Sequence, residues 1–261
     1  MPDSLTAMDR EGTRLPRGWI IAEVLLVLGL SLGRSAVYSV VDFIASLTSG
    51  VPLAAQTTTL NASLSARPGL DLTFQLLRIA FALVVVGLVA YLLHRSGESM
   101  RTIGADFSQP LRDLARGAGL ALVVGGAGLL WYLAAHRLGI NLAVAAQALP
   151  DQWWRWPVLL LGALENAIVE EVVVLGFVVH RLRQLGWSWP AAITSSALIR
   201  GAYHLYQGIG GFVGNVIMGL LFGWLFKRWG RVAPMIVAHA LIDIVAFIGY
   251  ALLAGRVSWL P

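Results

Sequence analysis

Seven long apolar blocks constrain this chain more than any other feature of its sequence. A helix that crosses a bilayer needs roughly 20 mostly apolar residues, and the seven blocks reach or approach that length. Because the hydrocarbon core admits only helices or closed barrels, the sequence predicts an all-α, polytopic transmembrane helical bundle with about seven to eight spans. The blocks are Trp19–Leu47, Phe74–Leu93, Leu114–Ala135, Trp156–Val179, Trp187–Tyr206, Phe212–Phe226 and Val232–Ala254.

Composition supports the membrane class. The chain is 57% hydrophobic and 13% charged, whereas a soluble domain carries about 25% charged residues. In a soluble protein, the net charge of +5 would suggest nucleic-acid binding. Here the basic residues lie mainly between apolar blocks, so the expected partner is the lipid bilayer and no nucleic acid is expected. The absence of cysteine excludes disulfides and thiolate chemistry.

Basic residues alternate between the connections, which predicts the orientation. By the positive-inside rule, the pattern places the N-terminus inside and the C-terminus outside. Nearly all basic residues are arginine, a bias typical of GC-rich bacterial genomes, so we expect a multi-pass protein of a bacterial inner membrane. The arginine-rich connections precede the first block (Arg10, Arg14, Arg17) and follow the second (Arg95, Arg101, Arg112, Arg116), the fourth (Arg181, Arg183) and the sixth (Lys227, Arg228, Arg231).

Four segments organise the predicted chain. We expect a cytoplasmic tail at residues 1–18, transmembrane helices without a motif at 19–155, a helical core with the buried polar residues at 156–254 and a C-terminal tail at 255–261. Between the first two blocks, Ser49–Asp71 is rich in Thr, Ser, Ala and Pro, and it is the expected linker.

Ionisable side chains inside apolar blocks are the first candidates for function, because each costs at least about 2.5 kcal/mol at the bilayer centre. The fourth block holds Glu165, Glu170 and Glu171. Adjacent helix positions differ by about 100°, so Glu170 and Glu171 must have different partners. One buried glutamate often pairs with an arginine to lock a bundle. Two adjacent buried glutamates favour a functional role, because the second carboxylate adds charge repulsion and a further free-energy cost of desolvation. Glu165 is interpreted as an edge residue or a packing contact.

Later blocks add pairs at helical spacing. Arg200 and His204 are four residues apart in the fifth block, as are His239 and Asp243 in the seventh, so each pair is expected on one helix face. Asn215 adds an amide in the sixth block, where several glycines indicate tight packing.

Glutamate with two histidines is a set of groups that can activate water for hydrolysis. The zinc-protease motif HExxH and a serine nucleophile elbow are both absent. The same side chains could instead pack the bundle, hold Zn²⁺ or relay protons.

These motifs resemble the CPBP (Abi) family of CAAX prenyl endopeptidase-like intramembrane proteases. That family has Glu-Glu-x-x-x-Arg, then Phe-x-x-x-His, then His-x-x-x-Asn/Asp on successive helices. Glu170-Glu171, His204 and His239-x-x-x-Asp243 match in order, over about Trp156 to Tyr250.

The resemblance implies an intramembrane endopeptidase that acts on a protein or peptide at the membrane. Glu170 would be the general base, His204 would hold the water, and Glu171 would support the site. His239 and Asp243 would bind the oxyanion or orient its binders. The family has been described both as metal-dependent and as glutamic; if a metal such as Zn²⁺ binds, the candidate ligands are Glu170, His204, His239 and Asp243.

Two positions depart from the family pattern. Leu175 stands where the motif has arginine, and Arg200 stands where it has phenylalanine. Because these changes are complementary in charge, we expect Arg200 to pair with Glu171.

Two other functions stay open at this point. One is a non-catalytic membrane immunity or scaffold protein, and the other is a proton-coupled transporter. Transporters tend to have two-fold internal repeats, and none is evident in the sequence.

Overall fold

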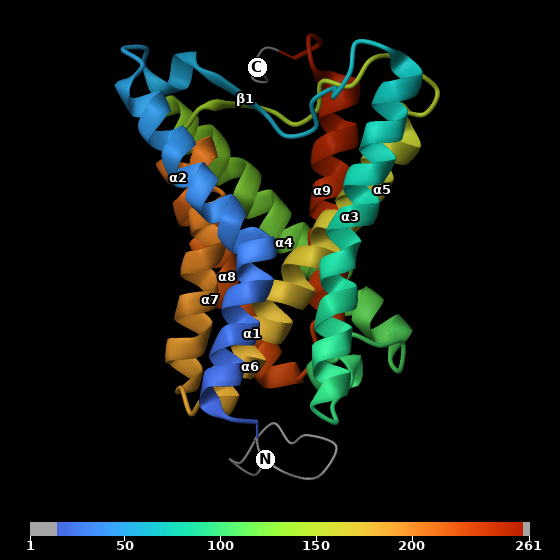
Figure 1. The fold of residues 1–261 in the computed structure, drawn as a ribbon. Coiled ribbons are helices and arrows are strands. Elements are labelled where there is room, and N and C mark those ends of the chain that lie inside the picture. Colours follow the sequence, from blue (N-terminus) through green and yellow to red (C-terminus); the bar gives the residue numbers. More distant parts are fainter. Residues whose placement is uncertain (1–14, 258–261) are drawn as a thin grey trace.

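The computed structural model describes residues 15–257 as a helical bundle (Figure 1). Residues 1–14, which hold most of the predicted cytoplasmic tail, and residues 258–261 lie outside the described part. All seven predicted blocks are helical. The α-helices are α1 (Arg17–Leu30), α2 (Leu32–Thr48), α3 (Pro68–Arg95), α4 (Pro110–Arg137), α5 (Arg155–Glu170), α6 (Val179–Gln184), α7 (Trp189–Tyr203), α8 (Ile209–Trp229) and α9 (Ala233–Leu253).

The predicted all-α, polytopic class is confirmed, and four to five spans can be assigned within the described residues. Helices α3, α4, α8 and α9 are each long and apolar enough to cross a membrane. The pair α1–α2, bent by 53° at Ser31, is a fifth candidate. The remaining two blocks form α5–α6, one continuous helical run over residues 155–184, and α7, which has 15 residues.

Apolar side chains cover the outside of the bundle. Leu122 and Leu130 on α4 and Phe81 on α3 are each at least 70% exposed. A soluble monomer rarely exposes such continuous apolar faces. Charged side chains, in contrast, are buried inside the bundle, among them Glu170, Glu171 and Arg200. Apolar side chains outside and charged side chains inside are typical of a protein embedded in a lipid bilayer.

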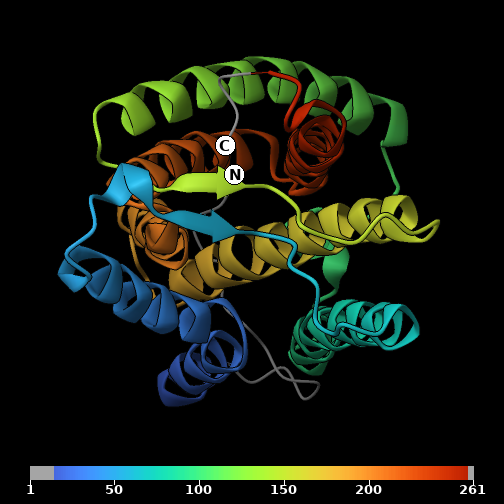
Figure 2. The same cartoon turned by 90° about the horizontal axis from the view of Figure 1, so that it is seen from above.

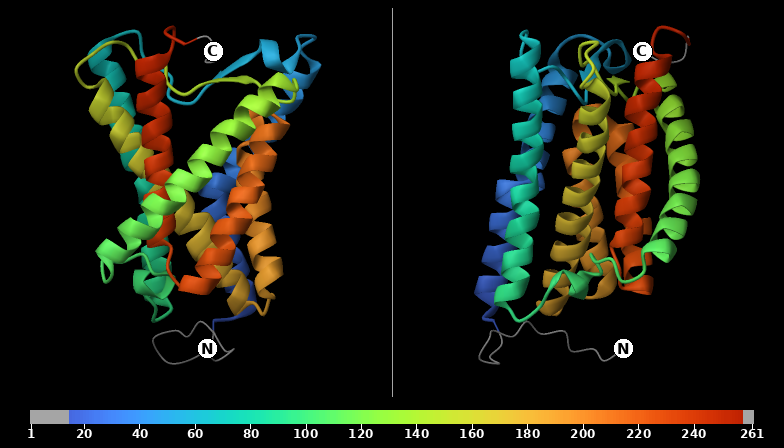
Figure 3. Two further views of the ribbon diagram at one scale, coloured as in Figure 1. Left: turned by 180° about the vertical axis from the view of Figure 1, so that it is seen from behind. Right: turned by 90° about the vertical axis from the view of Figure 1, so that its right-hand side faces the viewer.

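Taking α1–α2 and α5–α6 each as one segment, successive segments run in alternating directions, so the connections gather at two ends (Figures 1 and 3). Seen from above, α5 lies in the middle of the bundle, between α1–α3 on one side and α4 and α9 on the other (Figure 2). It packs against both α3 and α9. The centre of the bundle is therefore the segment that carries the glutamates.

The arginine-rich connections lie together at the end where α1 starts, as the predicted orientation requires. Some of these residues are buried rather than free in the interface. Arg181 is fully buried, and its guanidinium contacts Glu23 on α1 at 2.9 Å and Glu98 after α3 at 2.8 Å. These contacts tie α6 to α1 and α3.

A second ionic contact holds the turn between α8 and α9. Arg231 bonds Asp113 at the start of α4 at 2.7 Å and lies 3.2 Å from Asp106. Hydrogen bonds from Ser108, with the nearby Arg231 guanidinium, lower the pKa of Asp106 from its usual value. The inner ends of α4 and α9 are thereby joined.

The opposite end carries a small sheet that the sequence did not predict. The predicted linker Ser49–Asp71 contains the 3₁₀ turn η1 (Leu53–Ala55) and strand β1 (Thr57–Thr59). Strand β1 pairs in parallel with β2 (Ala143–Ala145), which follows α4. The sheet satisfies backbone groups that would otherwise lack partners and ties two distant loops together.

Glycines let α7 and α8 approach closely, as the glycine-rich sixth block predicted. A Cβ added at Gly201 would lie 2.5 Å from Val216 Cγ2, and one added at Gly219 would lie 2.9 Å from Ala197 Cα. The α7–α8 pair is therefore packed backbone against backbone.

We predict that Gly201→Ala lowers the free energy of unfolding by about 1–3 kcal/mol, the usual cost of overpacking a tight contact. The measurement is unfolding of the purified protein in mixed detergent. Gly126→Ala on α4 is the matched control, because a Cβ there meets nothing within 4 Å. Equal stability of the two variants would contradict the packing argument.

Candidate active site

The glutamate pair lies where the helix changes its winding. Glu170 is the last residue of α5, and Glu171 begins a π-helical segment, η3 (Glu171–Val178). Three consecutive valines follow Glu171, and β-branched residues are crowded in a regular α-helix. Ser196 on α7 donates to the carbonyl of Val174 at 2.8 Å. Because π-helical turns often occur at functional sites, this local winding agrees with the predicted role of the pair.

Glu171 is fully buried and bound by two cationic or potentially cationic side chains. Its Oε1 accepts hydrogen bonds from Nη2 of Arg200 and from Nδ1 of His239, the latter at 2.8 Å. The predicted Arg200–Glu171 pair is thus confirmed. Leu175, at the motif arginine position, is buried in the apolar core. Arg200 on α7 therefore supplies the positive charge beside Glu171 that the motif arginine, here Leu175, does not supply.

Glu170 shares Arg200 with Glu171, so the predicted difference in partners holds only for its hydrogen bond, which comes from Tyr203. The hydroxyl of Tyr203 donates to Glu170 Oε2 at 2.7 Å, and Arg200 Nη1 lies 3.7 Å from the same oxygen. Among the described residues, Glu170 Oε1 accepts no hydrogen bond. One guanidinium thus lies between both carboxylates, while Glu170 keeps an oxygen available for a further contact.

His204 lies just past the C-terminus of α7. Its Nδ1 is 3.0 Å from the carbonyl oxygen of Arg200, so that nitrogen must be the donor and Nε2 is left as the acceptor in a neutral ring. The predicted block ran on to Tyr206, but α7 ends at Tyr203 and the turn η4 (Leu205–Gln207) follows. The 15 residues of α7 span about 22 Å at 1.5 Å per residue.

Asp243 completes the group on α9. Its Oδ2 lies 3.5 Å from His239 Nε2 and accepts a hydrogen bond from Asn166 Nδ2 at 2.8 Å. Carboxylates thus flank the His239 ring on both sides, and the spacing of four residues does place His239 and Asp243 on one face. Asn166 connects α9 back to α5.

Two other predicted residues lie apart from this group. Asn215 donates to the carbonyl of Gly211 in its own helix at 3.0 Å. Glu165 is buried and lies 3.6 Å from Arg78 on α3, which agrees with its interpretation as a packing contact.

Sequence reasoning missed Tyr203 and Asn166 as members of the site. Asn166 is four residues before Glu170 and Tyr203 is three after Arg200, so both share a face with a predicted residue. That spacing was the available signal. The connected side chains, here called the central cluster, are Asn166, Glu170, Glu171, Arg200, Tyr203, His204, His239 and Asp243.

The described residues contain no group of three or more His, Asp or Glu side chains placed to hold a metal ion. In the central cluster, Glu171 is held by Arg200 and His239 rather than facing the other carboxylates. The predicted Zn²⁺ ligand set of Glu170, His204, His239 and Asp243 is therefore not assembled in this arrangement of the described residues.

We predict that Arg200→Met lowers the free energy of unfolding by about 3–5 kcal/mol, because it leaves a buried carboxylate unpaired. The double variant Glu171→Gln/Arg200→Met should be more stable than Arg200→Met alone. Unfolding of purified variants in mixed detergent measures both.

The Arg155–Asp151 pair offers a control, because the Asp151 side chain is 89% exposed and stays solvated without its partner. Arg155→Met should cost about 0–1 kcal/mol. If Arg200→Met is as mild as that, Arg200 is not what stabilises Glu171.

The central cluster falls entirely within one matched region of the chain. Comparison with protein families matches residues 152–245 to the family described as type II CAAX prenyl endopeptidase, Rce1-like. Searches of curated proteins and of solved structures gave no significant match. Residues 152–245 of this chain are therefore similar to the Rce1-like type II CAAX prenyl endopeptidase family.

Proposed function

We propose that the protein is an intramembrane endopeptidase that hydrolyses a peptide bond with water activated by Glu170. One observation carries the proposal: the Glu170 carboxylate, with an available oxygen, is buried beside a guanidinium and a phenol, and the adjacent Glu171 binds an imidazole. If these side chains served only to pack the helices, each charge would be expected to have a partner. The family match over the same residues supports the same reaction class.

Glu170 suits the role of general base better than Glu171. Glu171 Oε1 already accepts hydrogen bonds from Arg200 and His239, so proton uptake there would break both. Glu170 accepts one from Tyr203 at Oε2 only. We assign Glu171 to holding Arg200 and His239 in place.

The proposed reaction needs no covalent intermediate. Water bound between Glu170 and Nε2 of His204 attacks the carbonyl carbon of the substrate, and Glu170 takes its proton. The resulting oxyanion is stabilised by nearby donors, for which Nε2–H of protonated His239 is our candidate. Nδ1 of that ring is held by Glu171, and Nε2 lies 3.5 Å from Asp243. Glu170 then returns the proton to the leaving amine, which gives a carboxylic acid and an amine.

We infer that the chain crosses the membrane seven times, with the end of α1 that carries Arg17 on the cytoplasmic side. The alternating helix directions and the grouping of basic connections at that end support this orientation. The expected location is a bacterial inner membrane, and the expected substrate is a protein or peptide at that membrane.

We predict that Glu170→Gln lowers the rate of peptide cleavage at least about 10²-fold, the typical contribution of a general base. His204→Ala and His239→Ala should also abolish cleavage. The assay uses purified protein in proteoliposomes with a pool of quenched fluorescent peptides, with and without a chelator. The metal-free mechanism predicts that the cleavage rate is unchanged by the chelator. Inhibition by the chelator would contradict a metal-free mechanism.

Glu165→Gln is the matched control, because it is buried on the same helix and paired with Arg78 outside the central cluster. It should keep the parental rate. Cleavage by Glu170→Gln at the parental rate would refute the assignment. If the parent cleaves nothing and the Glu170→Gln variant keeps the biological function, a non-catalytic scaffold protein is favoured. Proton uptake coupled to the transport of a solute would favour a transporter.

A separate prediction concerns Tyr203. Tyr203→Phe removes the hydrogen bond to Glu170 and should lower kcat about 10-fold to 100-fold, the range expected for a bond to a charged group. Steady-state kinetics in the same assay measures it. Tyr132→Phe is the control, since the Tyr132 hydroxyl accepts from the backbone N–H of Val144 and, among the described residues, makes no bond to the central cluster. Equal effects would contradict a specific role for Tyr203.

A further inference from the structure

A polar pocket is lined by Tyr203, the residue whose hydroxyl donates to Glu170. Its volume is about 400 Å³, and α2 forms one wall while Tyr203 and Tyr206 form the other. The α2 residues that line it are Arg34, Ser35, Tyr38, Ser39 and Asp42. Tyr203 therefore both faces the pocket and donates to Glu170.

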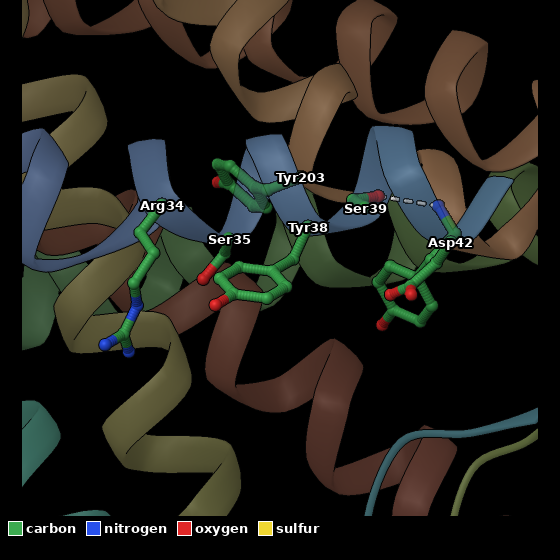
Figure 4. A pocket seen from close by; sticks show the side chains of 7 residues that line it. Arg34, Ser35, Tyr38, Ser39, Asp42 and Tyr203 are labelled. Atoms are coloured by element: carbon green, nitrogen blue, oxygen red, sulfur yellow. Dashed lines mark hydrogen bonds between the residues drawn. The ribbon is translucent and has the colours of Figure 1, made fainter. Parts of the chain in front are cut away.

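The α2 wall is organised as two rows. Arg34, Tyr38 and Asp42 are spaced four residues apart, and Ser35 and Ser39 form a second row beside them. Figure 4 shows Arg34, Tyr38 and Asp42 projecting from the same side of α2, with Tyr203 between Arg34 and Asp42 along the helix. Ser39 accepts a hydrogen bond from the backbone of Tyr206 at 2.7 Å, which fixes α2 against η4.

Two opposite charges at this wall have no partner. Arg34 and Asp42 are exposed, and neither forms an ion pair or a hydrogen bond with any residue in the described part of the chain. Arg34 lies near the middle of the bent α1–α2 span. An unpaired charge at that depth is costly, and such residues usually serve function.

The spacing of the two charges matches an extended peptide. Arg34 and Asp42 are eight helical residues apart, or about 12 Å at 1.5 Å per residue. An extended chain covers that distance in about four residues at 3.3 Å each, and residues four apart then point to the same side. Tyr203, and behind it Glu170, lies opposite the middle of that length.

We propose that this pocket binds the substrate as an extended peptide, with an anionic group at Arg34 and a cationic side chain at Asp42, about four residues apart. Arg34 and Asp42 are thus specificity-determining residues, and the bond to be cleaved lies between the two charged positions. This inference rests on the proposed peptidase function and adds the charge pattern of its substrate.

The test measures peptide binding to the Glu170→Gln variant in nanodiscs, so that cleavage cannot interfere. Four fluorescent peptides are identical except at two positions about four residues apart, which carry Asp and Lys, two Asp, two Lys or two Gln. The Asp/Lys peptide should bind about fivefold more tightly than the others, the factor expected for one modest ion pair.

Charge reversal in the protein should switch this preference. Arg34→Glu should favour the two-Lys peptide, and Asp42→Lys should favour the two-Asp peptide. The Arg34→Gln variant should no longer prefer Asp at that peptide position, and it should not prefer Lys either. This neutral variant keeps the test valid if Arg34→Glu fails to fold. Arg137→Glu, on the exposed last residue of α4 and outside the pocket, is the matched control and should change nothing.

Two results would overturn the inference. The first is an unchanged peptide preference in all three α2 variants. The second is displacement of peptide by anionic lipid in the nanodisc with no discrimination among the peptides, which would make Arg34 a lipid headgroup contact. The parent's cleavage of the same peptides is measured separately. If the parent cleaves peptides but the charge-reversed variants keep the parental peptide preference, only this inference is refuted. If the variants change their peptide preference but the parent cleaves nothing, only the peptidase function is refuted.

Discussion

The buried contact between Glu171 and Arg200 is the interaction on which the centre of this protein depends. Both side chains are almost completely removed from solvent, and either charge alone would be strongly destabilising there. The pair fixes α7 against η3, and the second bond from Glu171 orients His239 on α9. The remaining members of the central cluster take their places around this contact. A charge pair that stabilises three helices thus also arranges the groups proposed for chemistry.

The helical blocks and most of the central cluster could be predicted from the sequence, because both follow from short-range rules. Apolar length predicts helices, and the spacing of His239 and Asp243 predicts a shared face. Arg200 could be paired with Glu171 because Leu175 leaves the usual cation position apolar. These inferences need only local periodicity and charge balance.

The features that the sequence did not reveal depend on tertiary contacts. The π-helical winding at Glu171–Val178 depends on how neighbouring elements pack, such as Ser196 on the carbonyl of Val174. The pairing of β1 with β2 joins segments more than eighty residues apart. Tyr203 and Asn166 are common residue types, and only the fold brings their polar atoms to Glu170 and Asp243. The burial of Arg181 also depends on tertiary contacts, with Glu23 and Glu98. The positive-inside rule counts Arg181 only as a basic residue in a connection.

The shortness of α7 has a consequence for the surrounding bilayer. A helix of 15 residues spans about 22 Å, whereas the hydrocarbon core is about 30 Å thick. In the seven-span arrangement that we propose, lipids beside α7 thin locally around the polar turn at η4, and this hydrophobic mismatch draws the headgroup region toward the protein centre. Water and polar peptide segments then have a shorter apolar distance to cross. The protein would accordingly be sensitive to acyl-chain length, with α7 setting the preferred thickness.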